Sequence, residues 1–266
     1  MPSFMCVQCG TEFAASEAPP AHCPICEDER QYVRHDGQAW TTMAALAEDH
    51  RLTIRPDDGV LGFGVEPRFA IGQRALLAET DHGNVLWDCV SLVNDLAVAA
   101  IASRGGLAAI AISHCHYYSA MVEWSRAFGE VPIHIHADDR QWVMRPDPAV
   151  RFWEGETLPL NPQLTLIRCG GHFAGGQVLH WRGRSGGDAI LAGDILQVVP
   201  TRRHLSFMRS YPNLIPLNAR TVRRIAAAVA PFRYDHIYGA WWDTNVIGNA
   251  ETAMATSVER YLAAIA

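Results

Sequence analysis

Three histidines and one aspartate are the residues of this chain whose types and positions best suit a chemical role. His114 and His116 follow the apolar run 107–112, which predicts a buried strand, and His172 and Asp194 each follow a further predicted strand. Loops at strand ends are where α/β enzymes collect functional residues, so we expect the four side chains to meet. Three imidazoles and one carboxylate suit zinc, iron or manganese, and they leave a coordination position for water.

Four cysteines near the N-terminus form a second candidate metal site. Cys6 and Cys9 make one Cys-x-x-Cys knuckle, and Cys23 and Cys26 make another. Two such knuckles that face each other bind one ion through four thiolates in a tetrahedron. The stretch resembles the short knuckles of rubredoxins and zinc ribbons. Zinc would make it a structural clip and iron would make it an electron carrier, and we favour zinc.

Composition restricts the classes of partner. The 266 residues carry a net charge of −6 and 49% of them are hydrophobic, which is enough for one large core and a small module. No block of basic residues indicates a nucleic-acid surface. The sequence contains no secretory signal and no uninterrupted apolar stretch of membrane-spanning length. We therefore expect a cytoplasmic protein that acts on a small molecule, with its oligomeric state open.

The elements that must position these residues follow an α/β pattern from about Asp36 onward. Two groups of strands with helices outside them indicate two sheets between helical layers. We divide the chain into a metal module, 1–35, and a main domain, 36–266. The predicted strands are 60–65, 74–79, 85–88, 107–112, 131–135, 164–168, 177–181, 189–192 and 236–239, and the predicted helices are 92–103, 120–128, 138–143, 218–230 and 251–265.

A series of short motifs in the main domain follows a recognisable order and spacing. The motifs are Leu86-Trp87-Asp88, Ser113-His114-Cys115-His116, Gly171-His172, Gly175-Gly176, Ala192-Gly193-Asp194, Ser210-Tyr211-Pro212-Asn213 and Tyr238-Gly239. In these motifs the chain resembles the metallo-β-lactamase-fold superfamily over residues 55–266. The resemblance implies an αββα sandwich with a metal site at one edge of its sheets. It also implies hydrolysis by a metal-activated water.

The chain departs from the superfamily's His-x-His-x-Asp-His motif in the second half of that motif. It has Tyr118 and Ser119 where the motif implies an aspartate and a histidine. It also reads Gly-Ala-Trp-Trp at 239–242, where the superfamily commonly offers a last histidine. All three missing groups belong to the second metal position, whereas the first position and the bridging Asp194 are retained. We infer a site for one ion, with Asp243 as a candidate replacement ligand at the second position.

The leading hypothesis is a hydrolase that uses one ion to activate water. The ion would lower the pKa of a bound water toward ~7, which suits an ester-, thioester- or lactone-like substrate. Asp194 would bind the ion or orient the hydroxide. Tyr118 would donate a hydrogen bond to an oxyanion, although a packed aromatic role suits it equally well. Trp241, Trp242 and Arg202 are candidates for the substrate pocket, with ordinary packing or solvation as the alternative.

Two other functions fit the same residues. His114, His172 and Asp194 make a two-histidine, one-carboxylate set of the kind that activates oxygen on non-haem iron. These positions match those used by the persulfide dioxygenase branch of the superfamily, but that branch keeps the full motif. The other possibility is a metal-binding relative without activity, and the retention of one complete ligand set argues against it.

Overall fold

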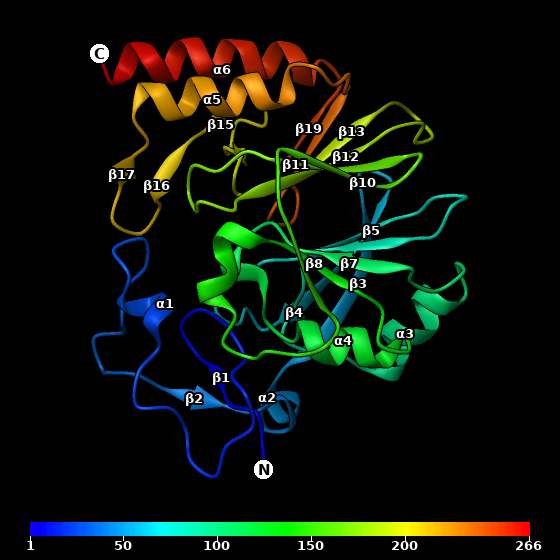
Figure 1. Cartoon of the computed structure of the whole chain (residues 1–266), viewed down its shortest axis with the longest axis vertical. Coiled ribbons are helices and arrows are strands. Elements are labelled where there is room, and N and C mark those ends of the chain that lie inside the picture. Colours follow the sequence, from blue (N-terminus) through cyan, green and yellow to red (C-terminus); the bar gives the residue numbers. More distant parts are fainter.

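Two β-sheets face each other in the computed structural model, which describes residues 1–266, and helices cover their outer faces (Figure 1). Side chains from both sheets, among them Trp87, Leu166 and Leu191, pack into one hydrophobic cluster between them. Separate clusters lie between each sheet and its helices. The predicted αββα sandwich is confirmed.

The first sheet has seven strands that follow one another in sequence order, from β3 to β9. Neighbours from β3 to β6 pair antiparallel, and neighbours from β6 to β9 pair parallel. The helices α3 (Asp95–Ala102) and α4 (Met121–Ala127) lie in the crossovers from β6 to β7 and from β7 to β8, and the side chain of Asn94 caps α3. The strands are β3 (Arg51–Asp57), β4 (Val60–Glu66), β5 (Ala75–Ala78), β6 (Val85–Trp87), β7 (Ala109–Ala111), β8 (Ile133–His136) and β9 (Val150–Trp153).

The second sheet has six strands in the order β10-β11-β12-β13-β18-β19. Only β13 and β18 pair parallel. The outer face of this sheet is covered by α5 (Ala219–Val229) and α6 (Ala250–Ala264), at the top of Figure 1. The strands are β10 (Thr157–Asn161), β11 (Leu164–Arg168), β12 (Gln177–Trp181), β13 (Ala189–Gly193), β18 (His236–Gly239) and β19 (Asn245–Ile247).

The N-terminal segment packs into the core of the first layer instead of standing apart from it. Its cysteines share a cluster of 31 buried residues with Phe63 and Trp124. It lies below the hairpin of β16 (Met208–Ser210) and β17 (Ile215–Pro216), at the left of Figure 1. The elements of this segment are β1 (Met5–Cys6), α1 (Pro24–Glu27), β2 (Trp40–Thr41) and α2 (Met43–Asp49). Because β1 pairs with β2, its small sheet joins residues on both sides of the predicted boundary at residue 35, and that boundary stays a prediction.

Every predicted strand and helix forms close to its expected position, but several elements were not predicted. The segment 138–143 is a 3₁₀-helix, η2 (Ala137–Trp142), and not an α-helix. The missed elements include α2, β3, β9, β10 and β19. The edge strand β3 carries Arg51, Arg55 and Pro56, and it is mostly solvent-accessible, so no apolar run marks it. The remaining short strands are β14 (Gln197–Val198) and β15 (Leu205–Ser206).

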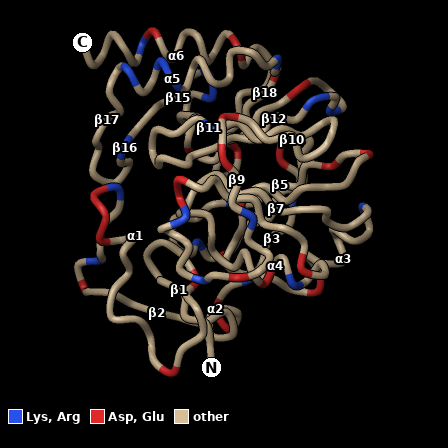
Figure 2. Tube along the Cα trace, viewed as in Figure 1, with Lys and Arg blue, Asp and Glu red and all other residues tan.

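Basic and acidic residues are interspersed along the chain, and no extended basic block forms (Figure 2). None of the helices combines the length and the apolar composition that crossing a membrane requires.

Candidate metal centres

The four predicted His and Asp ligands come together at one end of the two sheets. His114 directly precedes the 3₁₀-helix η1 (Cys115–Tyr117), which contains His116 and follows β7. His172 lies in the loop after β11, and Asp194 directly follows β13. One nitrogen or oxygen atom of each side chain lies within 4.8 Å of those of the other three. We call these four residues the His/Asp group, and they can hold one metal ion.

The donor atoms of the His/Asp group face one another closely. Nδ1 of His116 lies 3.2 Å from Nε2 of His114 and 3.3 Å from Nε2 of His172. Oδ1 of Asp194 lies 3.3 Å from Nε2 of His114 but has no hydrogen-bond partner. A buried carboxylate oxygen without a partner is costly unless a cation or a donor meets it, so the group fits a metal ion.

Outer hydrogen bonds orient two of these imidazoles. Nδ1 of His172 donates to the carbonyl oxygen of Arg209 at 2.6 Å, which leaves the lone pair on Nε2 directed at the group. Nδ1 of His114 lies 3.2 Å from the hydroxyl oxygen of Ser113, and the backbone N–H of Ser113 donates to Oδ1 of Asp88 at 2.7 Å. Partners of this kind fix the tautomer and the ring orientation of metal-binding histidines.

Burial controls the charges in the His/Asp group. It lowers the pKa of His172 to about 4 and holds those of His114 and His116 well below their ordinary value. Burial also raises the pKa of Asp194 to about 7. The three imidazoles are therefore neutral near pH 7, as metal ligands must be.

Aromatic side chains enclose the His/Asp group. Its four members are at most 3% exposed. The ring of Phe173 stacks on His114 with centroids 5.2 Å apart, and Tyr117 meets His114 edge-on at 5.0 Å. Tyr211 lies 5.6 Å from the ring of His172, and its hydroxyl donates to the carbonyl oxygen of Asp194. In this conformation, a substrate reaches the group only if part of this cover moves.

Other contacts occupy the residues at the second metal position of the superfamily. The hydroxyl of Ser119 lies 2.8 Å from that of Ser91 and donates to the carbonyl oxygen of Gly10 at 3.4 Å. Asp243 lies outside the His/Asp group, and its exposed carboxylate pairs with Arg55 at 3.1 Å. The buried guanidinium of Arg74 donates to the carbonyl oxygen of Gly239, at the start of the loop where the superfamily offers a last histidine.

Of the two neighbouring tyrosines, Tyr117 and not Tyr118 packs directly against His114. Both hydroxyl oxygens are buried and lack hydrogen-bond partners. Burial holds both pKa values well above the ordinary range, and the next contribution comes from Asp194 for Tyr117 but from Asp139 for Tyr118. The charge of Asp194 thus adds to the rise in the pKa of Tyr117, whereas the predicted catalytic role of Tyr118 stays a prediction.

The predicted substrate residues lie outside the His/Asp group. Trp242 packs on β4, where a Cβ atom at Gly62 or Gly64 would lie only 2.6 or 2.7 Å from its ring. Nε1 of Trp241 donates to the carbonyl oxygen of Ile71 at 2.9 Å. Arg202 is exposed and donates to the carbonyl oxygen of Asp243. Roles for these residues in binding a substrate stay predictions.

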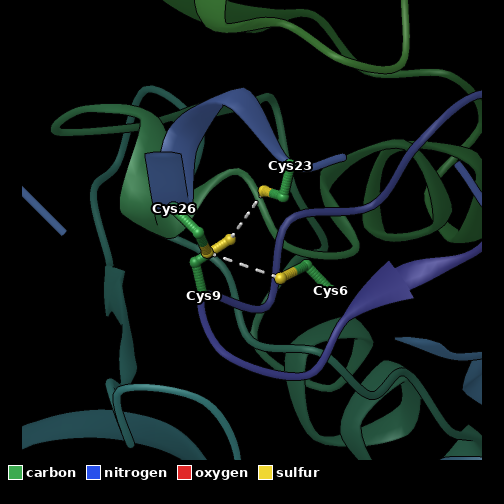
Figure 3. A group of neighbouring side chains, drawn as sticks. All are labelled: Cys6, Cys9, Cys23 and Cys26. Atoms are coloured by element: carbon green, nitrogen blue, oxygen red, sulfur yellow. Dashed lines mark hydrogen bonds between the residues drawn. The ribbon is translucent and has the colours of Figure 1, made fainter. Parts of the chain in front are cut away.

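The four N-terminal cysteines form the second group, which we call the tetra-Cys group. Figure 3 shows their sulfur atoms pointing toward one another. Cys6 ends β1 and Cys9 follows it in the next turn, whereas Cys23 directly precedes α1 and Cys26 lies within it. Sγ of Cys6 lies 3.6 Å from that of Cys26, and Sγ of Cys9 lies 3.7 Å from that of Cys23. Hydrogen bonds from the other three thiols hold the pKa of Cys6 well below its usual range. Four buried sulfurs with these separations can hold one ion.

Sequence reasoning missed several residues around the His/Asp group. Asp88 and Ser113 stand within the recognised motifs, so their position next to His114 was a usable signal. Arg30 had no such signal, because its contact with the carbonyl oxygen of His172 joins positions 142 residues apart.

Comparison with known proteins gives one close relative in sequence. The "Uncharacterized protein YmaE" of Bacillus subtilis (strain 168) is 45% identical over 269 residues, which cover 100% of this chain and 97% of that protein. No protein-family model matches the chain.

Several solved structures share the fold at low sequence identity. The DIM-1 metallo-β-lactamase has a TM-score of 0.59 at 11% identity, over 80% of this chain and 98% of that one. The SMB-1 metallo-β-lactamase has a TM-score of 0.52 at 17% identity, over 79% of this chain and 95% of that one. The chain therefore belongs to the same family as the Bacillus subtilis protein, and it has the metallo-β-lactamase fold with a tetra-Cys group added near the N-terminus.

Proposed function

We propose that this protein is a metal-dependent hydrolase that uses one ion in the His/Asp group to act on an ester-, thioester- or lactone-like small molecule. The observation that carries the proposal is the convergence of four buried donor side chains, two of whose imidazoles are oriented from behind. Zinc is the proposed ion, since three imidazoles and one carboxylate are ligands that it accepts.

Each ligand of the His/Asp group would have a defined role in the reaction. A bound ion would supply Lewis acidity and a coordinated water with a pKa near ~7. His114, His116 and His172 provide neutral nitrogen donors, and Asp194 provides a carboxylate that binds the ion or accepts a hydrogen bond from the attacking water. The enclosing rings of Phe173 and Tyr117 exclude bulk water, which strengthens these interactions.

A buried hydroxyl without a partner is suited to donate a hydrogen bond to an oxyanion, and the chain offers two. Tyr118→Phe tests the role predicted from the sequence, and Tyr117→Phe tests the neighbouring tyrosine that packs against His114. If one of these tyrosines donates the hydrogen bond, its Phe variant should show a kcat about 100-fold lower than wild type. The Phe variant of the other tyrosine should keep most of its activity. Both variants should keep their full metal content, since neither tyrosine belongs to the His/Asp group.

The closure of the site favours a second candidate, a metal-binding protein without hydrolytic activity. All four members of the His/Asp group are at most 3% exposed, whereas catalytic zinc sites keep an open position for water. Under this alternative the ion stabilises the junction of the two sheets.

Metal analysis combined with a substrate panel separates these functions. Purified protein should hold two ions per chain, one in each group. The variant His116→Ala should lose one ion and the hydrolysis of esters, thioesters and lactones. The control His180→Ala removes a buried histidine outside both groups, whose Nε2 donates to the carbonyl oxygen of Arg233, and it should keep both ions. A fully loaded protein that is inert on the whole panel would favour the non-catalytic alternative, and iron in the His/Asp group would favour oxygen chemistry.

A further inference from the structure

The tetra-Cys segment reaches the His/Asp group through Arg30. One Nη atom of Arg30 donates to the carbonyl oxygen of His172 at 3.3 Å. The guanidinium carbon also lies 4.0 Å from the ring centre of Phe173, the residue that stacks on His114. A single side chain from the N-terminal segment therefore contacts both the backbone of a ligand and the ring that covers the site.

The position of Arg30 depends on the second cysteine knuckle. Asp28, two residues after Cys26, accepts hydrogen bonds from both Nε and Nη2 of Arg30, the second at 2.7 Å. Only 12% of the Arg30 side chain and 19% of the Asp28 side chain are exposed. Two parallel hydrogen bonds of this kind fix the plane of the guanidinium. The position of the second knuckle therefore determines the position of Asp28 and, through it, that of Arg30.

A second set of contacts joins the same segment to the residue that orients His172. Glu29 accepts a hydrogen bond from Nε of Arg209 at 2.6 Å, and the carbonyl oxygen of Arg209 holds Nδ1 of His172. The carbonyl oxygen of Arg30 accepts from the hydroxyl of Ser210 at 3.1 Å. The N-terminal segment and the β16–β17 hairpin are neighbours in Figure 1, and each contributes one hydrogen bond to His172.

We propose that the two metal groups are energetically coupled, and that Arg30 is the positioning residue that carries the coupling. An ion in the tetra-Cys group orders the segment from Cys26 to Arg30, and this segment sets the orientation of His172 in the His/Asp group. The inference rests on metal binding by the His/Asp group, which is part of the proposed function, but it does not depend on hydrolysis. Because such coupling is reciprocal, an ion in either group raises the affinity of the other by the same factor.

Cobalt(II) titration of the full chain tests the role of Arg30. Cobalt bound by four thiolates shows intense sulfur-to-metal charge transfer, whereas cobalt bound by nitrogen and oxygen shows weaker d–d bands, so the two groups are read separately. Arg30→Ala should weaken cobalt binding to the His/Asp group by about 10-fold and alter its d–d bands, the effect typical of a lost outer partner. The cobalt affinity of the tetra-Cys group, measured while the His/Asp group is empty, should stay within about twofold of the wild-type value.

The chain contains a matched control for this variant. Arg34 forms a similar two-bond pair with Asp36 in the same segment, but the two side chains are 39% and 67% exposed. Arg34→Ala should leave the affinity and the spectrum of both groups unchanged. Arg30→Lys should recover only part of the lost affinity, because an ammonium keeps the charge but lacks the planar fork.

Selective loading completes the test. In wild-type protein, prior loading of the tetra-Cys group with zinc should tighten cobalt binding to the His/Asp group by about the factor that Arg30→Ala removes. In Arg30→Ala protein, the same loading should have little effect. Equal His/Asp affinity in wild type and Arg30→Ala, with cobalt bound in both, would overturn the coupling alone. Wild-type protein that binds no metal in the His/Asp group would overturn the proposed function as well.

Discussion

The tetra-Cys group and the His/Asp group are equally buried but are assembled over very different lengths of chain. The four cysteines lie within residues 6–26, at one strand and one short helix. The His/Asp ligands are spread over residues 114–194 and come from the ends of strands in both sheets. The first group is thus set by local chain geometry, whereas the second exists only once the two sheets have packed together.

Although the tetra-Cys group is local in sequence, it is part of the main hydrophobic core. The cysteines belong to the largest hydrophobic cluster of the molecule, together with residues of the first sheet and of η1. Loss of their ion should therefore affect the whole fold, whereas loss of the His/Asp ion should mainly affect the junction between the sheets.

The largest expected effect comes from breaking the local group. Cys9→Ser should remove one ion per chain and lower the free energy of unfolding by more than about 4 kcal/mol, because the ion supplies folding energy to the segment and its core contacts. Chemical denaturation followed by circular dichroism, together with metal analysis, measures both. As a control, Cys169→Ala alters a buried cysteine outside both groups and should keep both ions. A Cys9→Ser protein as stable as wild type would show that the segment folds independently of its ion.

A second prediction concerns the support of the long-range group. Asp139 of η2 is 1% exposed, and its Oδ1 accepts from the backbone N–H of Gly175, three residues after His172. Burial raises its pKa from 3.8 to about 6, against the opposing effects of the Gly175 hydrogen bond, Arg30 and Arg168 and with a further increase from Asp138. The folded protein thus holds a neutral carboxyl at pH values where the unfolded chain has ionised it.

The raised pKa of Asp139 makes the free energy of unfolding depend on pH. The contribution of Asp139 to stability is fully present below pH 3.8 and is lost as the pH rises through about 6. A pKa difference of this size is worth about 3 kcal/mol. Asp139→Asn should remove the part of the fall in the free energy of unfolding with rising pH that is due to Asp139. The amide oxygen of Asn can still accept the hydrogen bond from the backbone N–H of Gly175. Urea unfolding at a series of pH values, with the metal content held constant, measures the change; identical pH profiles for the two proteins would contradict it.

A smaller effect is expected where the segment with the tetra-Cys group packs against the first layer of the main domain. Gly10 has a φ of +78°, and a Cβ atom there would lie 3.1 Å from Cβ of Ala70 and 3.3 Å from the hydroxyls of Ser91 and Ser119. Gly37 has a φ of +95° but no atom near the corresponding position. Gly37→Ala should cost about 1 kcal/mol from backbone strain alone, and Gly10→Ala should cost about 2 kcal/mol because crowding adds to the strain. Equal losses in thermal or urea unfolding would mean that the junction is loosely packed.

The smallest effect is expected at Asp243. Its carboxylate is 69% exposed and pairs only with the exposed side chain of Arg55. Asp243 has a φ of +61°, a backbone conformation that Asn tolerates as well as Asp, so Asp243→Asn removes the charge without adding strain. This variant should change the free energy of unfolding by less than about 0.5 kcal/mol, as is usual for such surface pairs. The metal content should stay at the wild-type value. A loss of metal in this variant would show that Asp243 is a replacement ligand. The second metal position would then be occupied, and the His/Asp group would not be the only site of the main domain.

Particular elements show why the sequence predicted the fold so well. The strands β11, β12 and β18 form with the predicted bounds, because each is a short apolar run between clear turn residues. The edge strands β3 and β10 were missed, since nearly all of their residues are exposed or half-buried and no apolar run remains. The four His/Asp residues could be grouped from their positions after strands, whereas the enclosure of the group by Phe173 and Tyr211 could not be predicted.

The sequence was sufficient to predict the tetra-Cys group, the αββα architecture and the loss of the second metal ligands, because short motifs with a characteristic spacing carry all three. Three features became visible only in the folded chain: the His/Asp group is closed, Tyr117 and not Tyr118 packs on His114, and Arg30 contacts His172. These features depend on contacts between residues far apart in the chain. Such contacts are set by how the two sheets and the N-terminal segment pack, and no local pattern encodes them.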